Sequence, residues 1–134
     1  MTTLDEILET FEALEDGEER LRYLMDLGRT LPPYPEDARD DDHLVAGCQS
    51  RVWLHAWRQE DRLRLAADSD AFIVRGLVAI LLAVYDGRTP ADAFAVDARA
   101  VFSGLGLDHQ LSMTRRNGLW SMIERIRHHA ARWA

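Results

Sequence analysis

Apolar residues recur every three or four positions over the first part of the chain, which is the spacing of one face of an α-helix. Thr3 and Glu6 form a capping box at the start of this pattern. A second stretch of the same kind predicts a helix over residues 19–27, with Gly28 just after its end. Three prolines in positions 32–35 cannot continue a helix, so an extended connector is expected there.

The apolar pattern changes to a period of two beyond residue 45, after an acidic stretch at 36–42 that is expected to be a solvated loop. Two alternating runs flank a turn at 59–62 and predict an antiparallel β-hairpin. One face of this hairpin carries Val52, Leu54, Ala56, Leu63, Leu65 and Ala67. Trp53 and Trp57 share the opposite face, where packing under another element is the favoured interpretation.

A longer run over residues 72–84 is apolar on nearly every side. Because a helix of that kind is buried, it is expected to be the central helix of the core. Asp68 or Ser69 is the expected cap at its start. Residues 89–92 are predicted to start another helix, with Thr89 before it and Pro90 at its first position. Further helices are predicted at 98–102 and about 115–133.

Helices come first in this pattern, the two strands follow together, and more helices complete the chain. Strands grouped in this way predict an α+β fold, in which a small antiparallel sheet packs against helices. The hairpin supplies two strands of this sheet, and the sequence allows for a third strand without locating it. A chain of 134 residues, with 47% apolar and 29% charged residues, is expected to form a single domain over residues 1–134.

Arginine supplies all 16 basic residues, so mechanisms that need a lysine, such as a Schiff base with PLP, are excluded. The formal net charge is −7, and residues 1–47 hold 14 acidic against 4 basic residues, which argues against a nucleic-acid partner. The most apolar stretch, residues 71–85, is too short to span a bilayer, and no signal peptide is visible. A single cysteine suits a reducing compartment, so a cytoplasmic protein with no membrane partner is expected.

Cys48 is the leading candidate for chemistry, and it lies between the acidic loop and the first strand. Gly47 allows a sharp bend of the backbone beside it, and Arg51 is close enough in sequence to favour the reactive thiolate. The alternative is an inert, buried cysteine that packs as a small apolar side chain. In that case the acidic first third of the chain favours a second hypothesis, a protein-interaction module.

A cysteine hydrolase is a third hypothesis, and it requires a histidine base beside the thiol. The candidates are His43, His55, His109, His128 and His129. No metal site is expected, because the sequence has neither an HExxH nor a CxxC motif. Arg115 and Arg116 lie near the start of the last helix, where the helix dipole disfavours cations. They are either ordinary solvated arginines or partners of a nearby anion or thiolate.

Four segments together resemble the SufE-like sulfur-acceptor family. They read Gly-Cys-Gln-Ser-Arg-Val-Trp at 47–53, Asp-Ser-Asp-Ala at 68–71, Ile-Val-Arg-Gly-Leu at 73–77 and Leu-Ser-Met-Thr-Arg at 111–115. The resemblance covers nearly the whole chain in the same order and spacing. The chain departs from the family pattern at Phe72, and at Arg75, where lysine is commoner.

This resemblance implies a function in sulfur transfer rather than that of a stand-alone enzyme. SufE-like proteins accept sulfur from the persulfide of a SufS-type, PLP-dependent cysteine desulfurase, and they stimulate that enzyme. They pass the sulfur to a SufBCD-type scaffold for iron–sulfur cluster assembly. The family fold is α+β, related to that of IscU-type scaffolds, with the cysteine on a loop beside an apolar cavity. PLP belongs to the partner, so no cofactor is expected in this chain.

Carried over by motif position, the resemblance makes Cys48 the sulfur acceptor. It places Asp70 near the partner-facing surface and Arg115 near the cysteine loop. The remaining residues expected in the cysteine loop or facing the partner are Gly47, Gln49, Ser50 and Arg51.

Overall fold

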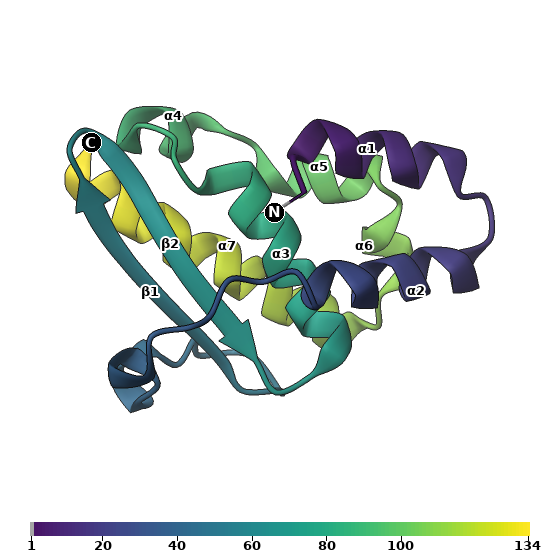
Figure 1. The fold of residues 1–134 in the computed structure, drawn as a ribbon, viewed down its shortest axis with the longest axis horizontal. Coiled ribbons are helices and arrows are strands. Elements are labelled where there is room, and N and C mark those ends of the chain that lie inside the picture. The colour runs from purple at the N-terminus through teal and green to yellow at the C-terminus, as the bar shows by residue number, and fades with distance from the viewer. Residues whose placement is uncertain (1) are drawn as a thin grey trace.

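A computed structural model describes residues 2–134 as an α+β fold (Figure 1). Its strands are β1 (Val52–Gln59) and β2 (Arg62–Ser69). Its helices are α1 (Leu4–Ala13), α2 (Gly17–Gly28), α3 (Phe72–Tyr85), α4 (Pro90–Ala95), α5 (Ala98–Gly104), α6 (Leu107–Gln110) and α7 (Met113–Trp133). Two short 3-10 turns, η1 (Glu36–Ala38) and η2 (Asp41–His43), precede the first strand. The predicted α+β class is therefore confirmed.

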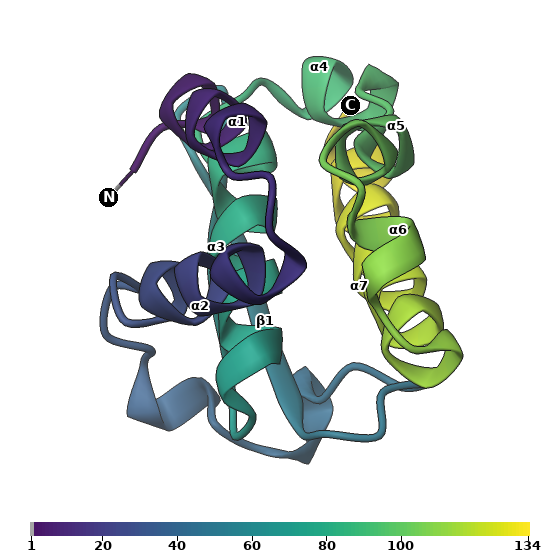
Figure 2. The same ribbon diagram turned by 90° about the vertical axis from the view of Figure 1, so that its right-hand side faces the viewer.

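The β-hairpin forms in the predicted register, with Leu54 opposite Ala67 and Ala56 opposite Leu65. Its inner face is buried against α3 and α7, which run behind the strands (Figure 1). Helices α1 and α2 cross α3 on the side away from the sheet (Figure 2). One cluster of buried side chains reaches from Ile7 in α1 to Ala130 in α7.

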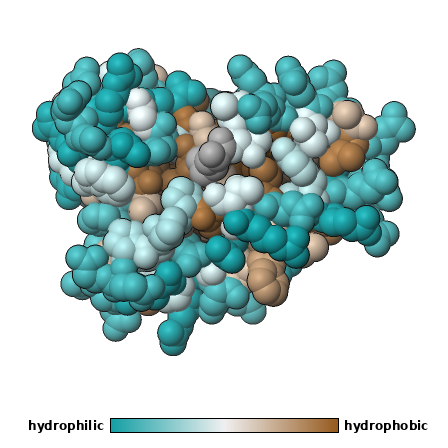
Figure 3. Space-filling model, viewed as in Figure 1, coloured by the Kyte–Doolittle hydropathy of each residue, from teal (hydrophilic) through white to brown (hydrophobic). Residues whose placement is uncertain are grey.

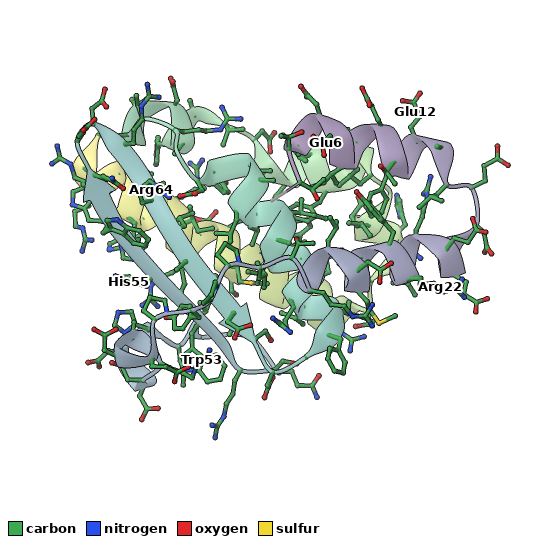
Figure 4. The ribbon with its side chains drawn as sticks, in the orientation of Figure 1. Glu6, Glu12, Arg22, Trp53, His55 and Arg64 are labelled. Carbon is green, nitrogen blue, oxygen red and sulfur yellow. The ribbon has the colours of Figure 1, made fainter. Side chains whose placement is uncertain are left out.

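The outer face of the hairpin is covered as well, which corrects the prediction of a solvated loop at 36–42. Tyr34, Ala38 and Trp53 form a second buried cluster on that face. The guanidinium of Arg39 lies 5.1 Å from the ring centre of Tyr34 and 4.8 Å from that of Trp53. Figure 4 shows Trp53 directed toward this segment. The acidic side chains of residues 36–42 are exposed, while Ala38 among them and the preceding Tyr34 pack inward.

Within residues 2–134 the sheet has only the two strands of the hairpin. The sequence allowed for a third strand, but in its place the structure has a single bridge between Leu44 and Trp53. The proline-rich connector, whose three prolines lack amide donors, passes beside the sheet without forming a ladder with it.

The cap predicted at the start of α3 is wrong. Asp68 and Ser69 are the last residues of β2, and Ala71 occupies the cap position without a side-chain hydrogen bond. Asp68 instead accepts hydrogen bonds from Arg39 at 2.9 Å and Arg75 at 3.0 Å. Its carboxylate therefore links the outer cover of the sheet to α3.

Several helix boundaries also differ from the predictions. Helix α2 includes Gly28, and α7 begins at Met113 because Ser112 accepts a hydrogen bond from the backbone of Arg115. Helix α6 was not predicted from the sequence. Phe72, assigned to the buried helix, is 69% exposed.

Acidic side chains of α1 and α2 point into solvent, among them Glu6 and Glu12 (Figure 4). Hydrophilic side chains dominate the face seen in Figure 3, and apolar atoms show mainly in the seams between elements. No helix in residues 2–134 is long and apolar enough to cross a membrane.

His129 in α7 is expected to make stability depend on pH. Burial, together with the nearby charges of Arg132 and Arg125, lowers its pKa from 6.5 to about 4. The unfolded chain takes up a proton near pH 6.5 and the folded chain only near pH 4, so stability is lost as pH falls through this window. We expect the wild type to lose about 1 kcal/mol more than His129→Gln between pH 7 and pH 5, allowing for solvent screening. Urea denaturation measures this, and equal losses in both proteins would contradict it.

Candidate functional site

The cysteine loop, residues 46–51, reaches its conformation through Gly47. This residue has φ of 86°, in the left-handed region that glycine adopts without strain. A Cβ atom at this position would lie 2.6 Å from Oγ of Ser121 in α7. The sharp bend expected at Gly47 is therefore present, and it lays the loop directly on α7.

Cys48 is half-buried where the loop meets α7. Its thiol donates a hydrogen bond to the backbone carbonyl of Gly118, with a distance of 3.5 Å between sulfur and oxygen. A Cβ atom on Gly118 would lie 3.4 Å from the sulfur, so the glycine leaves the helix surface open for the side chain. The thiol is sheltered in this conformation but is not sealed in the core.

A pocket of about 50 Å³ opens beside Cys48. A group the size of a water molecule needs only about 10–15 Å³ of such space, so there is room for one further sulfur atom. The wall combines apolar side chains of the core with polar groups of the loop and of α7. It consists of Cys48, Gln49, Ser50, Val52, Val74, Leu77, Thr114, Arg115, Gly118 and Met122.

Burial raises the pKa of the Cys48 thiol above its ordinary value of 9.0. Within residues 2–134 no charged group offsets this effect, which corrects the expectation that Arg51 favours the thiolate. The side chain of Arg51 is exposed and does not line the pocket. In the sheltered conformation the thiol is therefore kept in its protonated, weakly nucleophilic form.

The end of the cysteine loop is held by the junction between β2 and α3. Oδ1 of Asp70 accepts a hydrogen bond from the backbone amide of Arg51 at 3.1 Å. The carbonyl of Arg51 accepts bonds from Oγ of Ser69 at 2.8 Å and from the amide of Asp70 at 3.3 Å. Movement of the cysteine is thereby confined to the part of the loop before Arg51.

The candidate residues thus gather at one end of the molecule. Gln49, Ser50 and Arg115 share the pocket with Cys48, and Asp70 reaches the loop through Arg51. Sequence reasoning missed Gly118 and Ser121, which contact the loop from α7. For Gly118 the sequence did carry a signal, which is a glycine on the buried side of an amphipathic helix. For Ser121 the sequence carried no such signal.

A cysteine hydrolase would need a histidine base beside the Cys48 thiol, and the structure places none there in residues 2–134. No histidine of residues 2–134 lines the Cys48 pocket or hydrogen-bonds to the thiol. His43, which lies nearest in sequence, instead pairs with Asp40 at 2.6 Å and contacts His55 at 3.3 Å. Across the described part of the chain, no group of three or more His, Cys, Asp or Glu residues is placed to hold a metal ion.

Replacing Gly47 with alanine is expected to expose the thiol. Alanine at a φ of 86° is strained by about 1–2 kcal/mol, and its Cβ presses on the hydroxyl of Ser121. Released from the pocket, Cys48 regains solvent and its pKa falls. We expect iodoacetamide to alkylate Gly47→Ala up to about tenfold faster than the wild type at pH 8. Ser121→Ala is the control with an unstrained loop, and an unchanged alkylation rate in Gly47→Ala would refute the sheltered geometry.

Comparisons with known proteins point to one family. The family model "SufE: Fe-S metabolism associated domain" matches residues 5–130. An uncharacterized SufE-like protein of Rhizobium etli is 45% identical over 97% of this chain and 90% of its own length. Another, from Rhizobium meliloti, is 44% identical over 97% of this chain and 96% of its own length.

A solved structure supports the fold independently. The solution structure of a hypothetical protein from Thermus thermophilus superimposes with a TM-score of 0.79, covering 97% of this chain and 94% of that one. At 23% identity this likeness bears on the fold alone. The family match over residues 5–130 and the two close relatives together show that the chain belongs to the SufE family of Fe–S metabolism associated domains.

Proposed function

We propose that Cys48 accepts sulfur from the persulfide of a PLP-dependent cysteine desulfurase of the SufS type. The single observation that carries this proposal is a lone, half-buried cysteine beside a pocket with room for one further sulfur atom. The chain has no second cysteine, so a persulfide on Cys48 cannot be resolved as an internal disulfide. That property suits a carrier.

The transfer step is an exchange between sulfur atoms. The Cys48 thiolate attacks the terminal sulfur of the partner's persulfide, and a new S–S bond forms at Cys48. The partner's own S–S bond breaks, and its cysteine leaves as a thiolate. The transferred sulfur keeps its proton, so the charge balances and no oxidant or reductant is consumed.

The sheltered thiol must leave its pocket to react. Burial raises its pKa and the Gly118 carbonyl holds its proton, so the resting side chain is a poor nucleophile. Docking of the desulfurase would draw the part of the loop around Gly47 outward, while Asp70 keeps its far end in place. After transfer, the pocket would protect the Cys48 persulfide from water and from reaction with small thiols in solution.

Stimulation of the desulfurase follows from the same step. Removal of the persulfide regenerates the partner's free cysteine, which can then begin another turnover. The loaded chain would deliver its sulfur to a SufBCD-type scaffold for iron–sulfur cluster assembly, in keeping with the Fe–S metabolism of its family. PLP and its lysine stay with the partner, because this chain contains no lysine.

The rate of alanine formation by the desulfurase tests this proposal. With free cysteine as substrate, no added reductant and the chain in large excess over the desulfurase, the wild-type chain should raise the initial rate severalfold, because each chain clears one persulfide. Chain whose Cys48 has been alkylated beforehand should give no stimulation. Equal stimulation by alkylated and untreated chains would favour an interaction module in which the cysteine is only structural.

A further inference from the structure

Two large apolar side chains are left in solvent beside the cysteine loop. Phe72 and Met113 are each 69% exposed, whereas the next most exposed large apolar side chain of residues 2–134, that of Phe94, is at 42%. Each is the first residue of its helix, α3 or α7. Isolated exposed apolar residues are common on protein surfaces. These two, by contrast, begin helices that both border the candidate site.

The first turns of α3 and α7 both border the Cys48 pocket. Val74 and Thr114 line the pocket wall. Val74 comes two residues after Phe72 in α3, and Thr114 directly follows Met113 in α7. Figure 2 shows the starts of the two helices at the same end of the molecule, with the cysteine loop passing between them. The first residues of α3 and α7, which carry the two exposed side chains, therefore lie on either side of the cysteine loop.

The charge at this end differs from that of the rest of the surface. Arg51 and Arg115 are exposed, and within residues 2–134 neither side chain forms an ion pair or a hydrogen bond. One oxygen of the nearby Asp70 carboxylate is taken up by the amide of Arg51. In a chain of net charge −7, the two unpaired guanidinium groups outnumber the Asp70 carboxylate beside them and make this end locally basic.

We propose that Phe72 and Met113 are the apolar anchors on which the persulfide-bearing desulfurase docks. This inference rests on the proposed function. The matching surface of the partner would be an apolar recess, flanked by carboxylates that face Arg51 and Arg115. Aromatic side chains are enriched among residues that dominate binding energy, and methionine adapts to irregular surfaces. The arginines steer the encounter between the two proteins and set its orientation.

The ring of Phe72 contributes little to the core of this chain, because it is mostly exposed. Its replacement is therefore expected to change docking and to leave the fold intact.

The concentration of chain that gives half-maximal stimulation of the desulfurase tests the anchors. We expect Phe72→Ser to raise this concentration about tenfold and the double variant with Met113→Ser to raise it further, at an unchanged maximal rate. Phe94→Ser is the matched control, since Phe94 is also exposed but lies on α4, far from the cysteine loop (Figure 1). It should shift the concentration less than twofold.

Two further measurements separate this proposal from the function on which it rests. Glutathione persulfide, a small donor that needs no docking surface, should load Cys48 equally in the wild type and in Phe72→Ser. Arg51→Gln should weaken the dependence of half-maximal stimulation on salt concentration. If the wild type stimulates the desulfurase but Phe72→Ser and the double variant do so at the same concentration, the anchors are refuted. If the wild type itself is neither loaded nor stimulatory, the proposed function fails.

Discussion

Replacement of Gly76 with alanine is expected to cost more than about 3 kcal/mol of folding free energy, which is a large part of the stability of a small domain. Gly76 lies where α3 crosses α2. A Cβ atom there would sit 2.1 Å from the backbone oxygen of Leu24 and 2.7 Å from its Cγ. The backbone of α2 cannot yield without pulling Leu24, which is fully buried, out of the core.

Urea denaturation measures the effect, with Gly104→Ala as the matched control. Gly104 is also a helical glycine, but a Cβ atom there would meet no atom of the described part of the chain within 4 Å. Its replacement should leave stability unchanged or raise it by less than about 1 kcal/mol. Similar midpoints for Gly76→Ala and the wild type would show that the two helices do not approach so closely.

Replacement of Cys48 with serine is expected to abolish the uptake of sulfur from the desulfurase. Serine offers no sulfur to form a persulfide, and no other cysteine exists to take over. The hydroxyl can still donate to the carbonyl of Gly118, so stability should change by less than about 1 kcal/mol. Sulfane sulfur bound to the protein is measured by cyanolysis after gel filtration.

The fold of the Cys48→Ser variant is checked by the same urea denaturation. An independent control is wild-type chain alkylated at Cys48, which keeps every other residue and should also take up no sulfur. Sulfur bound to Cys48→Ser in the amount found for the wild type would mean that the chain carries sulfur elsewhere.

Local patterns predicted the elements that depend on local chemistry. The alternation of apolar residues gave the hairpin with its register, because a shift by one residue would turn Leu54 and Leu65 into solvent. Thr3 and Thr89 cap their helices as expected, because a cap requires only a neighbouring amide. Cys48 was singled out as the only cysteine, beside a glycine at which the backbone bends.

Features that depend on distant parts of the chain were not predicted. The cap expected at Asp68 failed because its carboxylate pairs with Arg39, which lies 29 residues earlier. The shelter of Cys48 depends on Gly118, 70 residues away, and a pattern of period two or four carries no information about such a contact. The raised pKa of the thiol follows from that shelter, so the neighbouring Arg51 was a misleading guide.

The mass of the intact chain tests the central claim most directly. The chain is incubated with the purified desulfurase, PLP and free cysteine, and its mass is then measured without reductant. A gain of one sulfur atom, about 32 Da, is predicted, and it should map to the peptide that contains Cys48. An unchanged mass, with the desulfurase turning over and the thiol still free, would contradict the claim that Cys48 receives the sulfur.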